Sequence, residues 1–312
     1  MTTITAQTIL RSRHSQRPEI ILSTLLLRYP RWIHAELMTH RAFSRNAASS
    51  RAIPVRKLID DIMMHPAIPL FWGKNQKGMQ AAKECDNTVH FTEGSRDHFL
   101  TNRMAWIYAR DNAVHLAEAF ADAGYHKQIV NRLLEPFSHI TVLVSATEWT
   151  NFLALRDHPD AEPHIQMLAR EIRRELDRTD NIQVLQPYRW HLPFSSRQPF
   201  DEGLRGRALH EAVNQEIKLS VSCCASTSYK TVDGFDMTME KAIEIHDKLV
   251  GSTPIHASPA EHVAQADERT FEVYRDTKGF RITAPDVWGH LEQHGNFTGF
   301  RQYRKMLPGE SL

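Results

Sequence analysis

The sequence has few of the features that mark secreted or membrane-spanning proteins. Its 312 residues include only three cysteines, Cys85 and the adjacent Cys223 and Cys224, which are too few for a disulfide framework. No apolar run approaches the roughly 20 residues that span a bilayer, and the first residues contain no long apolar block before a cleavage site. These absences predict a cytoplasmic protein with no membrane partner.

An excess of charge of one sign is also missing. Lysine plus arginine number 38 and aspartate plus glutamate 37, so no general field attracts nucleic acid, and there is no basic stripe or recognisable binding module. A protein that binds nucleic acid through residues 40–51 therefore stays a distant alternative. The 18 histidines show no His-Glu-x-x-His spacing and no Cys-x-x-Cys is present, so we predict no metal ligand and rank a metal hydrolase lower still.

The chain does have enough apolar residues, 41 %, to bury a sizeable core as one large domain or two closely packed ones. Residues 20–30 (IILSTLLLRYP) predict a buried strand that stops at a proline, and residues 31–45 predict a helix with one polar face. Residues 140–146 fit a strand or a helix, while 65–95 and 179–203 predict loops. Further helices are predicted at 54–64, 97–124, 127–135, 146–156, 161–178, 204–221 and 236–250.

The segment from Thr39 to Pro54 (THRAFSRNAASSRAIP) is poor material for a core because arginines, hydroxyls and a histidine crowd into it. A helix that runs out into a Ser-Ser-Arg turn would present guanidinium groups and freed backbone N–H groups together, which suits a phosphate or a planar heterocycle. The alternative from this local pattern is a solvated helix end held by ion pairs.

This segment resembles the signature of the flavin-dependent thymidylate synthases, in which Arg-His-Arg is followed at fixed spacing by Ser and Ser-x-Arg. AGYHKQIVNRLLEP (123–136) is similar to the family's phosphate-binding helix, and ATEWTNFLALR (146–156) is similar to its Asn-Phe-Leu-x-Leu-Arg segment. CCASTSY (223–229) and HASPAEH (256–262) resemble a serine strand and a histidine turn that lie upstream of the signature in the family. Their position downstream here implies a circular permutation, which a compact fold tolerates.

The resemblance implies an α+β fold with a central mixed sheet flanked by many helices. It implies a flavin- and nucleotide-binding catalytic domain over 1–265, and it leaves 266–312 as a C-terminal extension of unknown role. FAD would be the cofactor, NADPH and methylenetetrahydrofolate the cosubstrates, and the assembly a homotetramer with flavin where subunits meet. The residues expected to hold the flavin are His40, Arg41, Ser44, Asn151, Ser228, His256 and His262.

For the nucleotide, the resemblance places Arg156 at the pyrimidine ring, where it would act as the catalytic cation. The residues expected to bind the nucleotide are Glu36, Ser49, Ser50, Arg51, Arg132 and Arg156. The expected reaction is one-carbon transfer to C5, with reductive methylation of dUMP to dTMP placed first. The alternative is 5-hydroxymethylation of dCMP or dUMP.

Several positions depart from the family pattern. Thr39 stands where the first signature arginine belongs, Ala47 replaces an acidic residue, and Ser226 lacks the arginine of the serine strand. Glu36 replaces a glutamine near the nucleotide, and a carboxylate accepts hydrogen bonds but cannot donate them. Because cytosine carries an amine where uracil carries a carbonyl, this change favours a shift from dUMP towards dCMP.

Overall fold

The computed structural model describes residues 3–227, 237–270, 273–275, 279, 281–283 and 287–310. The strands are β1 (Thr5–His14), β2 (Ile21–Pro30), β3 (Ser44–Ala47), β4 (Val89–Glu93), β5 (Arg96–Leu100), β6 (His139–Ala146), β7 (Ile182–Leu185), β8 (Trp190–His191), β9 (Ala264–Ala266), β10 (Arg269–Thr270), β11 (Val273–Arg275), β12 (Arg281–Thr283), β13 (Val287–Trp288) and β14 (Phe300–Gln302).

The helices are α1 (His34–Met38), α2 (Val55–Met64), α3 (Asn102–Asp122), α4 (Lys127–Val130), α5 (Thr150–Arg156), α6 (Pro163–Asp177), α7 (Gly206–Ala225), α9 (Met239–Val250) and α10 (Tyr303–Met306). The 3-10 helices are η1 (Arg31–Ile33), η2 (Ser50–Ala52), η3 (Asn131–Phe137), η4 (Pro199–Asp201), η5 (Ser258–His262) and η6 (Leu291–Gln293).

A five-stranded sheet of order β3-β6-β2-β1-β7 forms the centre. Its neighbours pair antiparallel except β1 and β7, which are parallel, so the sheet is mixed. The whole of β6 is buried, which explains why its apolar sequence showed no alternation that could tell strand from helix.

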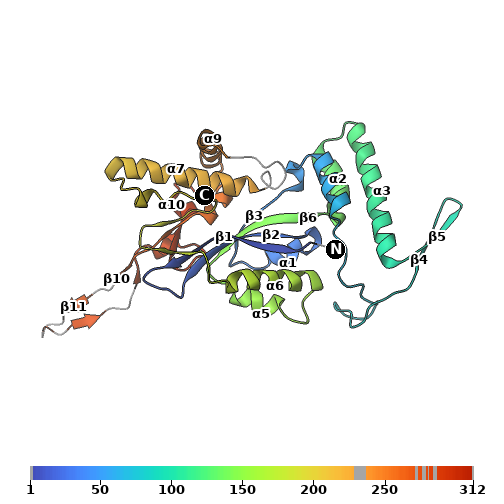
Figure 1. Ribbon diagram of the computed structural model, residues 1–312, viewed down its shortest axis with the longest axis horizontal. Coiled ribbons are helices and arrows are strands. Elements are labelled where there is room, and N and C mark those ends of the chain that lie inside the picture. The colour runs from blue at the N-terminus through green and yellow to red at the C-terminus, as the bar shows by residue number, and fades with distance from the viewer. Residues whose placement is uncertain are drawn as a thin grey trace.

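Different helices cover the two faces of the central sheet (Figure 1). On one face, Leu25, Leu27 and Tyr29 of β2 pack with residues of α1, α5 and α6 in the largest apolar cluster. Burying side chains of this size stabilises the fold by about 1.5 to 3 kcal/mol each. On the other face, α7 lies over one end of the sheet and α2 over the other (Figure 1). The fold is α+β with a central mixed sheet and flanking helices, as predicted.

Two predictions are wrong in the segments that resemble the family. The helix predicted for 31–45 ends at Met38, and Ser44–Ala47 instead forms β3, because its backbone pairs with the edge of β6. The expected serine strand at 223–229 is wrong over Cys223–Ala225, which complete α7, because the buried face of that helix continues through Val221 and Cys224. Ser228 and Tyr229 lie outside the described residues.

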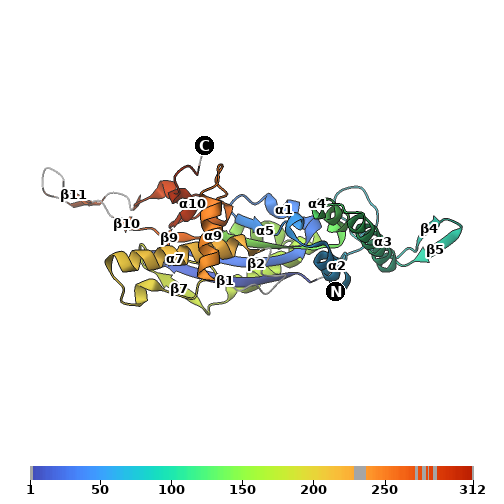
Figure 2. The ribbon, with the colours of Figure 1, turned by 90° about the horizontal axis from the view of Figure 1, so that it is seen from above.

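Both segments predicted as loops contain short strands, and the helix predicted for 97–124 is wrong over 97–100, where β5 pairs with β4 and α3 begins only at Asn102. Hydrogen bonds between β4 and β5 form a hairpin at one end of the molecule, while β11 lies at the other end (Figure 2). Gly94 in the hairpin turn has φ +58°, a conformation that glycine adopts without strain. Within 179–203, β7 extends the central sheet and β8 pairs with β9.

The C-terminal segment 287–310 packs against the body of the protein. β14 pairs with β9, and Phe297 and Phe300 join Leu22 of β2 in a buried cluster. Asp267, which is fully buried, accepts hydrogen bonds from His290 Nδ1 (2.9 Å) and His294 Nε2 (3.0 Å). The division at residue 265 between a catalytic domain and an extension therefore stays a prediction about function.

The helices of the described residues include none with the length and apolar character that a membrane span needs.

Candidate active site

Arg156, the last residue of α5, lies against the end of α1 and the residues that follow it. Its Nη1 donates to Glu36 Oε2 at 3.1 Å, and its Nε donates to His40 Nε2 at 3.0 Å. Thr39 Oγ1 lies 3.5 Å from Nη2. A carboxylate and an imidazole therefore fix the plane of the guanidinium, and three of the residues picked out by sequence come together.

Aromatic rings pack against the cluster formed by Glu36, His40 and Arg156. The ring of His40 meets Phe152 edge-on at 4.9 Å, and Phe43 packs 4.7 Å from Trp149 and 5.3 Å from Phe152. Phe43 and Phe152 are almost fully buried, so they position the chain from 40 to 43 on α5. Offset and edge-on ring pairs of this kind contribute about 0.5 to 1.5 kcal/mol beyond their buried area.

The surroundings shift the pKa of two groups in the cluster. Burial raises the pKa of the Glu36 carboxyl, although the Arg156 guanidinium opposes that shift. Burial lowers the pKa of His40, and Arg156 and then Arg45 lower it further. His40 is therefore neutral near pH 7, which leaves Nε2 free to accept from Arg156 and places the ring proton on Nδ1.

The cluster borders a cavity of about 370 Å³. Arg41 and Asn151, both expected at the flavin, are exposed at its edge. Its lining residues are Thr39, His40, Arg41, Ala42, Phe43, Glu148, Asn151, Phe152, Leu155 and Arg156. The cavity thus has an apolar floor and several hydrogen-bonding groups around it, as a site for a planar heterocycle requires.

A second hollow of about 470 Å³ shares Arg41 and Phe43 with the first. Its other lining residues are Arg45, Glu261, Gly295, Asn296, Gln302, Arg304 and Lys305. Arg304 bonds to Glu261 and Glu310, and Lys305 bonds to Glu310, so the wall is basic but partly neutralised. The two hollows adjoin at Arg41 and Phe43, and together they are called the groove, with an apolar part in the first hollow and a basic part in the second.

Other residues expected at the flavin do not line this groove. Ser44 is 1 % exposed, donates to Asn296 Oδ1 at 3.1 Å and accepts from Gln302 Nε2 at 2.9 Å. His262 is fully buried against Ser145, with 2.9 Å between Nδ1 and Oγ. His256 is exposed, and Ser228 falls outside the described residues.

His262 ends a buried chain of hydrogen bonds across the sheet. The chain runs from Ser12 Oγ to His191 Nδ1 (2.6 Å), from His191 Nε2 to Thr24 Oγ1 (2.8 Å), and from Thr24 to Ser145 Oγ (2.6 Å). Burial lowers the pKa of His191 and of His262 to about 3, so both rings are neutral. In this structure His262 joins η5 to the sheet, and its expected contact with flavin stays a prediction.

The residues expected at the nucleotide phosphate form a separate group around Glu135. Ser50 Oγ donates to Glu135 Oε1 at 2.6 Å, and Arg132 Nη1 donates to the same oxygen at 3.1 Å. Arg51 is exposed, and Ser49 is partly exposed beside it. β3 separates this group from the Arg156 cluster by four residues, or about 13 Å of strand.

Sequence reasoning missed several residues that shape the site. Glu135 follows Arg132 at i+3, a spacing typical of a helical ion pair, so a signal for it was present. Asn296 and Gln302 had no signal, because they lie more than 250 positions from the Ser44 that they contact. In the part of the chain that the structure describes, no group of three or more His, Cys, Asp or Glu side chains is arranged to hold a metal ion.

Comparison with solved structures gives weak likenesses. The UMP/dUMP methylase PolB from Streptomyces cacaoi bound with 5-Br UMP is 15 % identical, with 56 % of this chain and 89 % of that chain covered and a TM-score of 0.41. The flavin dependent thymidylate synthase ThyX from Helicobacter pylori complexed with FAD and dUMP is 19 % identical, with 52 % and 74 % covered and a TM-score of 0.32.

Comparison with curated proteins gives no match. Comparison with protein families gives a match. Residues 3–180, more than half of the chain, match the family model described as thymidylate synthase complementing protein. That range contains α1, β3, α5 and the whole Arg156 cluster. The chain therefore belongs to the thymidylate synthase complementing protein family and is, as the sequence predicted, an enzyme of the transferase class.

Proposed function

We propose that this enzyme transfers a one-carbon unit from methylenetetrahydrofolate to C5 of a pyrimidine deoxynucleotide, and that its reaction is the reductive methylation of dUMP to dTMP. The observation that carries the proposal is Arg156, held between Glu36 and His40 beside a cavity in a chain of this family. FAD, when bound, would supply the redox chemistry, with NADPH as the source of electrons.

Arg156 provides the stabilisation of charge that this reaction needs. C5 of a pyrimidine is a weak nucleophile, so its bond to the one-carbon unit forms only if the charge that develops in the ring is stabilised, and the C5 proton must then leave. A guanidinium whose plane is already fixed by Glu36 and His40 stabilises that charge without reorganising. One hydride equivalent completes the methyl group.

The groove supports the proposed cofactor. His40, Arg41 and Asn151 would surround the ring system in the first hollow, and Arg41, Arg45 and Arg304 would face the diphosphate in the second. On this proposal the C-terminal segment forms one wall of the flavin site.

The nucleotide phosphate would bind at Ser49, Ser50, Arg51 and Arg132. The separation of that group from Arg156 by β3 supports a site completed by another subunit, and hence the homotetramer.

The contact of η5 with β3 brings the HASPAEH segment beside the signature, which supports the permuted order. Cys85, Cys223 and Cys224 form no disulfide, which agrees with the cytoplasm as the proposed location.

One observation favours a second candidate, transfer to a cytosine nucleotide. Glu36 Oε2 is bonded to Arg156, while its carboxylate can still accept another N–H. The exocyclic amine of dCMP offers such a donor, and the O4 carbonyl of dUMP does not. Hydroxymethylation, in which water captures the one-carbon unit and no net reduction occurs, remains the alternative outcome at C5.

The test combines a spectrum with a product mass. Purified protein should show a flavin absorption spectrum and, with methylenetetrahydrofolate and NADPH, should add one methyl group to dUMP. Arg156→Ala should abolish product formation, while Arg174→Ala, at an exposed position on α6, should not. Methyl transfer to dCMP in preference to dUMP would favour the second candidate, a hydroxymethyl product without NADPH consumption would favour the alternative outcome, and absence of any transfer would refute the proposal.

A further inference from the structure

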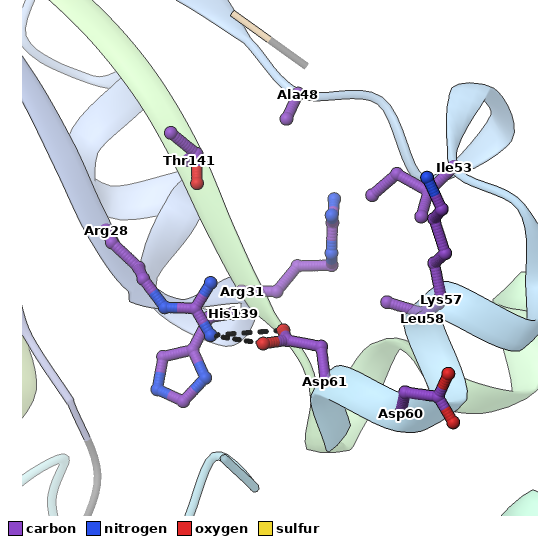
Figure 3. Close-up of a pocket in the computed structure, with 10 residues that line it drawn as sticks. All are labelled: Arg28, Arg31, Ala48, Ile53, Lys57, Leu58, Asp60, Asp61, His139 and Thr141. Atoms are coloured by element: carbon purple, nitrogen blue, oxygen red, sulfur yellow. Dashed lines mark hydrogen bonds and ion pairs between the residues drawn. The ribbon is translucent and has the colours of Figure 1, made fainter. Parts of the chain in front are cut away.

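Two arginines of the central sheet differ in what they bond to. Arg28 of β2 donates to both carboxylate oxygens of Asp61, at 2.8 and 3.0 Å, so that pair is neutral as a whole (Figure 3). Arg45 of β3 bonds to the backbone instead, because its Nη1 donates to the carbonyl oxygen of Met38 at 2.8 Å and to that of His40 at 3.2 Å. In the part of the chain that the structure describes, no bonded carboxylate cancels the charge of Arg45.

The two carbonyls lie at the end of α1, where a helix leaves its last C=O groups without partners of its own. Met38 is the last residue of α1, and His40 follows it two positions later. β3 is held in turn by its pairing with β6, in which Arg45 lies opposite Val144. Arg45 therefore ties the end of α1 to an edge strand of the central sheet, and the place of His40 depends on that tie.

His40 holds Arg156 only while its ring is neutral. Its Nε2 accepts from Arg156 Nε at 3.0 Å, and a protonated ring would turn an N–H towards that N–H and lose the bond. Phe152 and Phe43 pack against the ring, with centroids 4.9 and 5.9 Å away, but they bring no charge. The protonation of His40 therefore depends on burial and on the charged groups nearby.

The charged groups around His40 come from several elements. They are Glu36 of α1, Arg41 after it, Arg45 of β3, Glu148 before α5, Arg156 at the end of α5, and Glu261 of η5, which faces Arg45. Burial lowers the pKa of His40, and Arg156 and then Arg45 lower it further. Because Glu36 is bonded to Arg156, it offsets part of that charge. Arg45 thus extends towards acid the pH range in which His40 is neutral.

We propose that Arg45 is a positioning residue for the reaction, which ties the end of α1 to β3 and so holds His40 against Arg156. The inference rests on the proposed function, because it gives Arg45 a task in the chemistry assigned to Arg156. This task differs from the contact with a diphosphate, since it is performed by Nη1 on two backbone carbonyls.

The first measurement is the titration of His40 by NMR in the full-length protein with isotope-labelled histidines, in which His40→Gln identifies the signal. Arg45→Met and Arg45→Gln remove a positive charge, so His40 should titrate at a higher pH than in the wild type. Arg45→Lys keeps the charge, so the titration should stay where it is in the wild type. This measurement needs no substrate and no turnover.

The second measurement is the pH profile of kcat, with dUMP and cosubstrates saturating and the rate counted per bound flavin. Protonation of His40 breaks its bond to Arg156, so kcat should fall towards acid as His40 titrates. Arg45→Met should lower kcat about tenfold at pH 8, because displacing a positioned group is costly, and should move the acid fall to higher pH. Arg45→Lys should lose part of kcat but keep the acid fall of the wild type.

Arg304→Met is the matched control. Arg304 lines the same hollow as Arg45, but its side chain bonds to Glu261 and Glu310 and not to the end of α1. It should weaken flavin binding and leave the titration of His40 and the acid fall of kcat as they are in the wild type. A flavin contact and a positioning role are thereby separated.

Two results would overturn the proposal. One is a titration of His40 that does not move in Arg45→Met, or that moves equally in Arg304→Met. The other is loss of flavin binding in Arg45→Met with a normal kcat per bound flavin and an unmoved acid fall, which would make Arg45 a cofactor contact alone. If Arg45→Met does not fold, Arg45→Gln and Arg45→Lys decide. Absence of methyl transfer in the wild type would refute the proposed function, and the NMR titration would still decide whether Arg45 acts on His40.

Discussion

The buried histidines His191 and His262 should make the protein sensitive to acid. Burial lowers the pKa of each to about 3 from 6.5, so both are neutral in the folded protein and become protonated when it unfolds below pH 6.5. The unfolded chain then binds more protons than the folded one, and stability falls as the pH drops from 6.5 towards 3. From pH 8 to pH 5 each histidine should remove about 2 kcal/mol from the free energy of unfolding.

The assay is urea denaturation at pH 8 and at pH 5. His262→Gln removes one titrating group, so the difference in unfolding free energy between the two pH values should shrink by about 2 kcal/mol. His191→Gln should shrink it by a similar amount, and the double variant by about twice as much. His210→Gln, at an exposed position on α7, is the control. Equal pH differences in the wild type and in the buried variants would refute the reasoning.

Three further predictions concern the site and its support. Glu36→Gln should raise the ratio of dUMP to dCMP turnover, because an amide can donate to a carbonyl; an unchanged ratio would remove Glu36 from base selection. Asp267→Ala should lower the free energy of unfolding by about 3 kcal/mol in urea denaturation, since the buried Nε2–H of His294 loses its acceptor; a loss below about 1 kcal/mol would contradict this. Arg51→Ala should weaken dUMP binding at least tenfold in calorimetry while flavin absorbance is retained, and His40→Ala should do the reverse; equal loss of both ligands in both variants would contradict the division of roles.

Much of the fold was accessible from sequence pattern. Helical periodicity located α2, α6 and α9 to within a few residues, and the apolar run ending at Pro30 located β2. These elements bury one face or a whole run against the core, so burial leaves a periodic trace in the sequence. The spacing from His40 to Arg51 likewise pointed to the segment that now borders two hollows.

Other features depend on partners far away in the chain. Ser44–Ala47 became a strand because β6 offered an edge, and Cys223–Ala225 became helix because α7 had a buried face to continue. Local propensity is weak enough for such tertiary contacts to override it.

The sequence by itself determined the composition of the core, most of the helices and the family to which the chain belongs. Only the tertiary structure decided which polar residues meet, such as Glu36 with Arg156 and Ser44 with Gln302. The physical reason is that hydrophobic burial is periodic along the chain, whereas a hydrogen bond between distant residues depends on where the packed elements place two atoms.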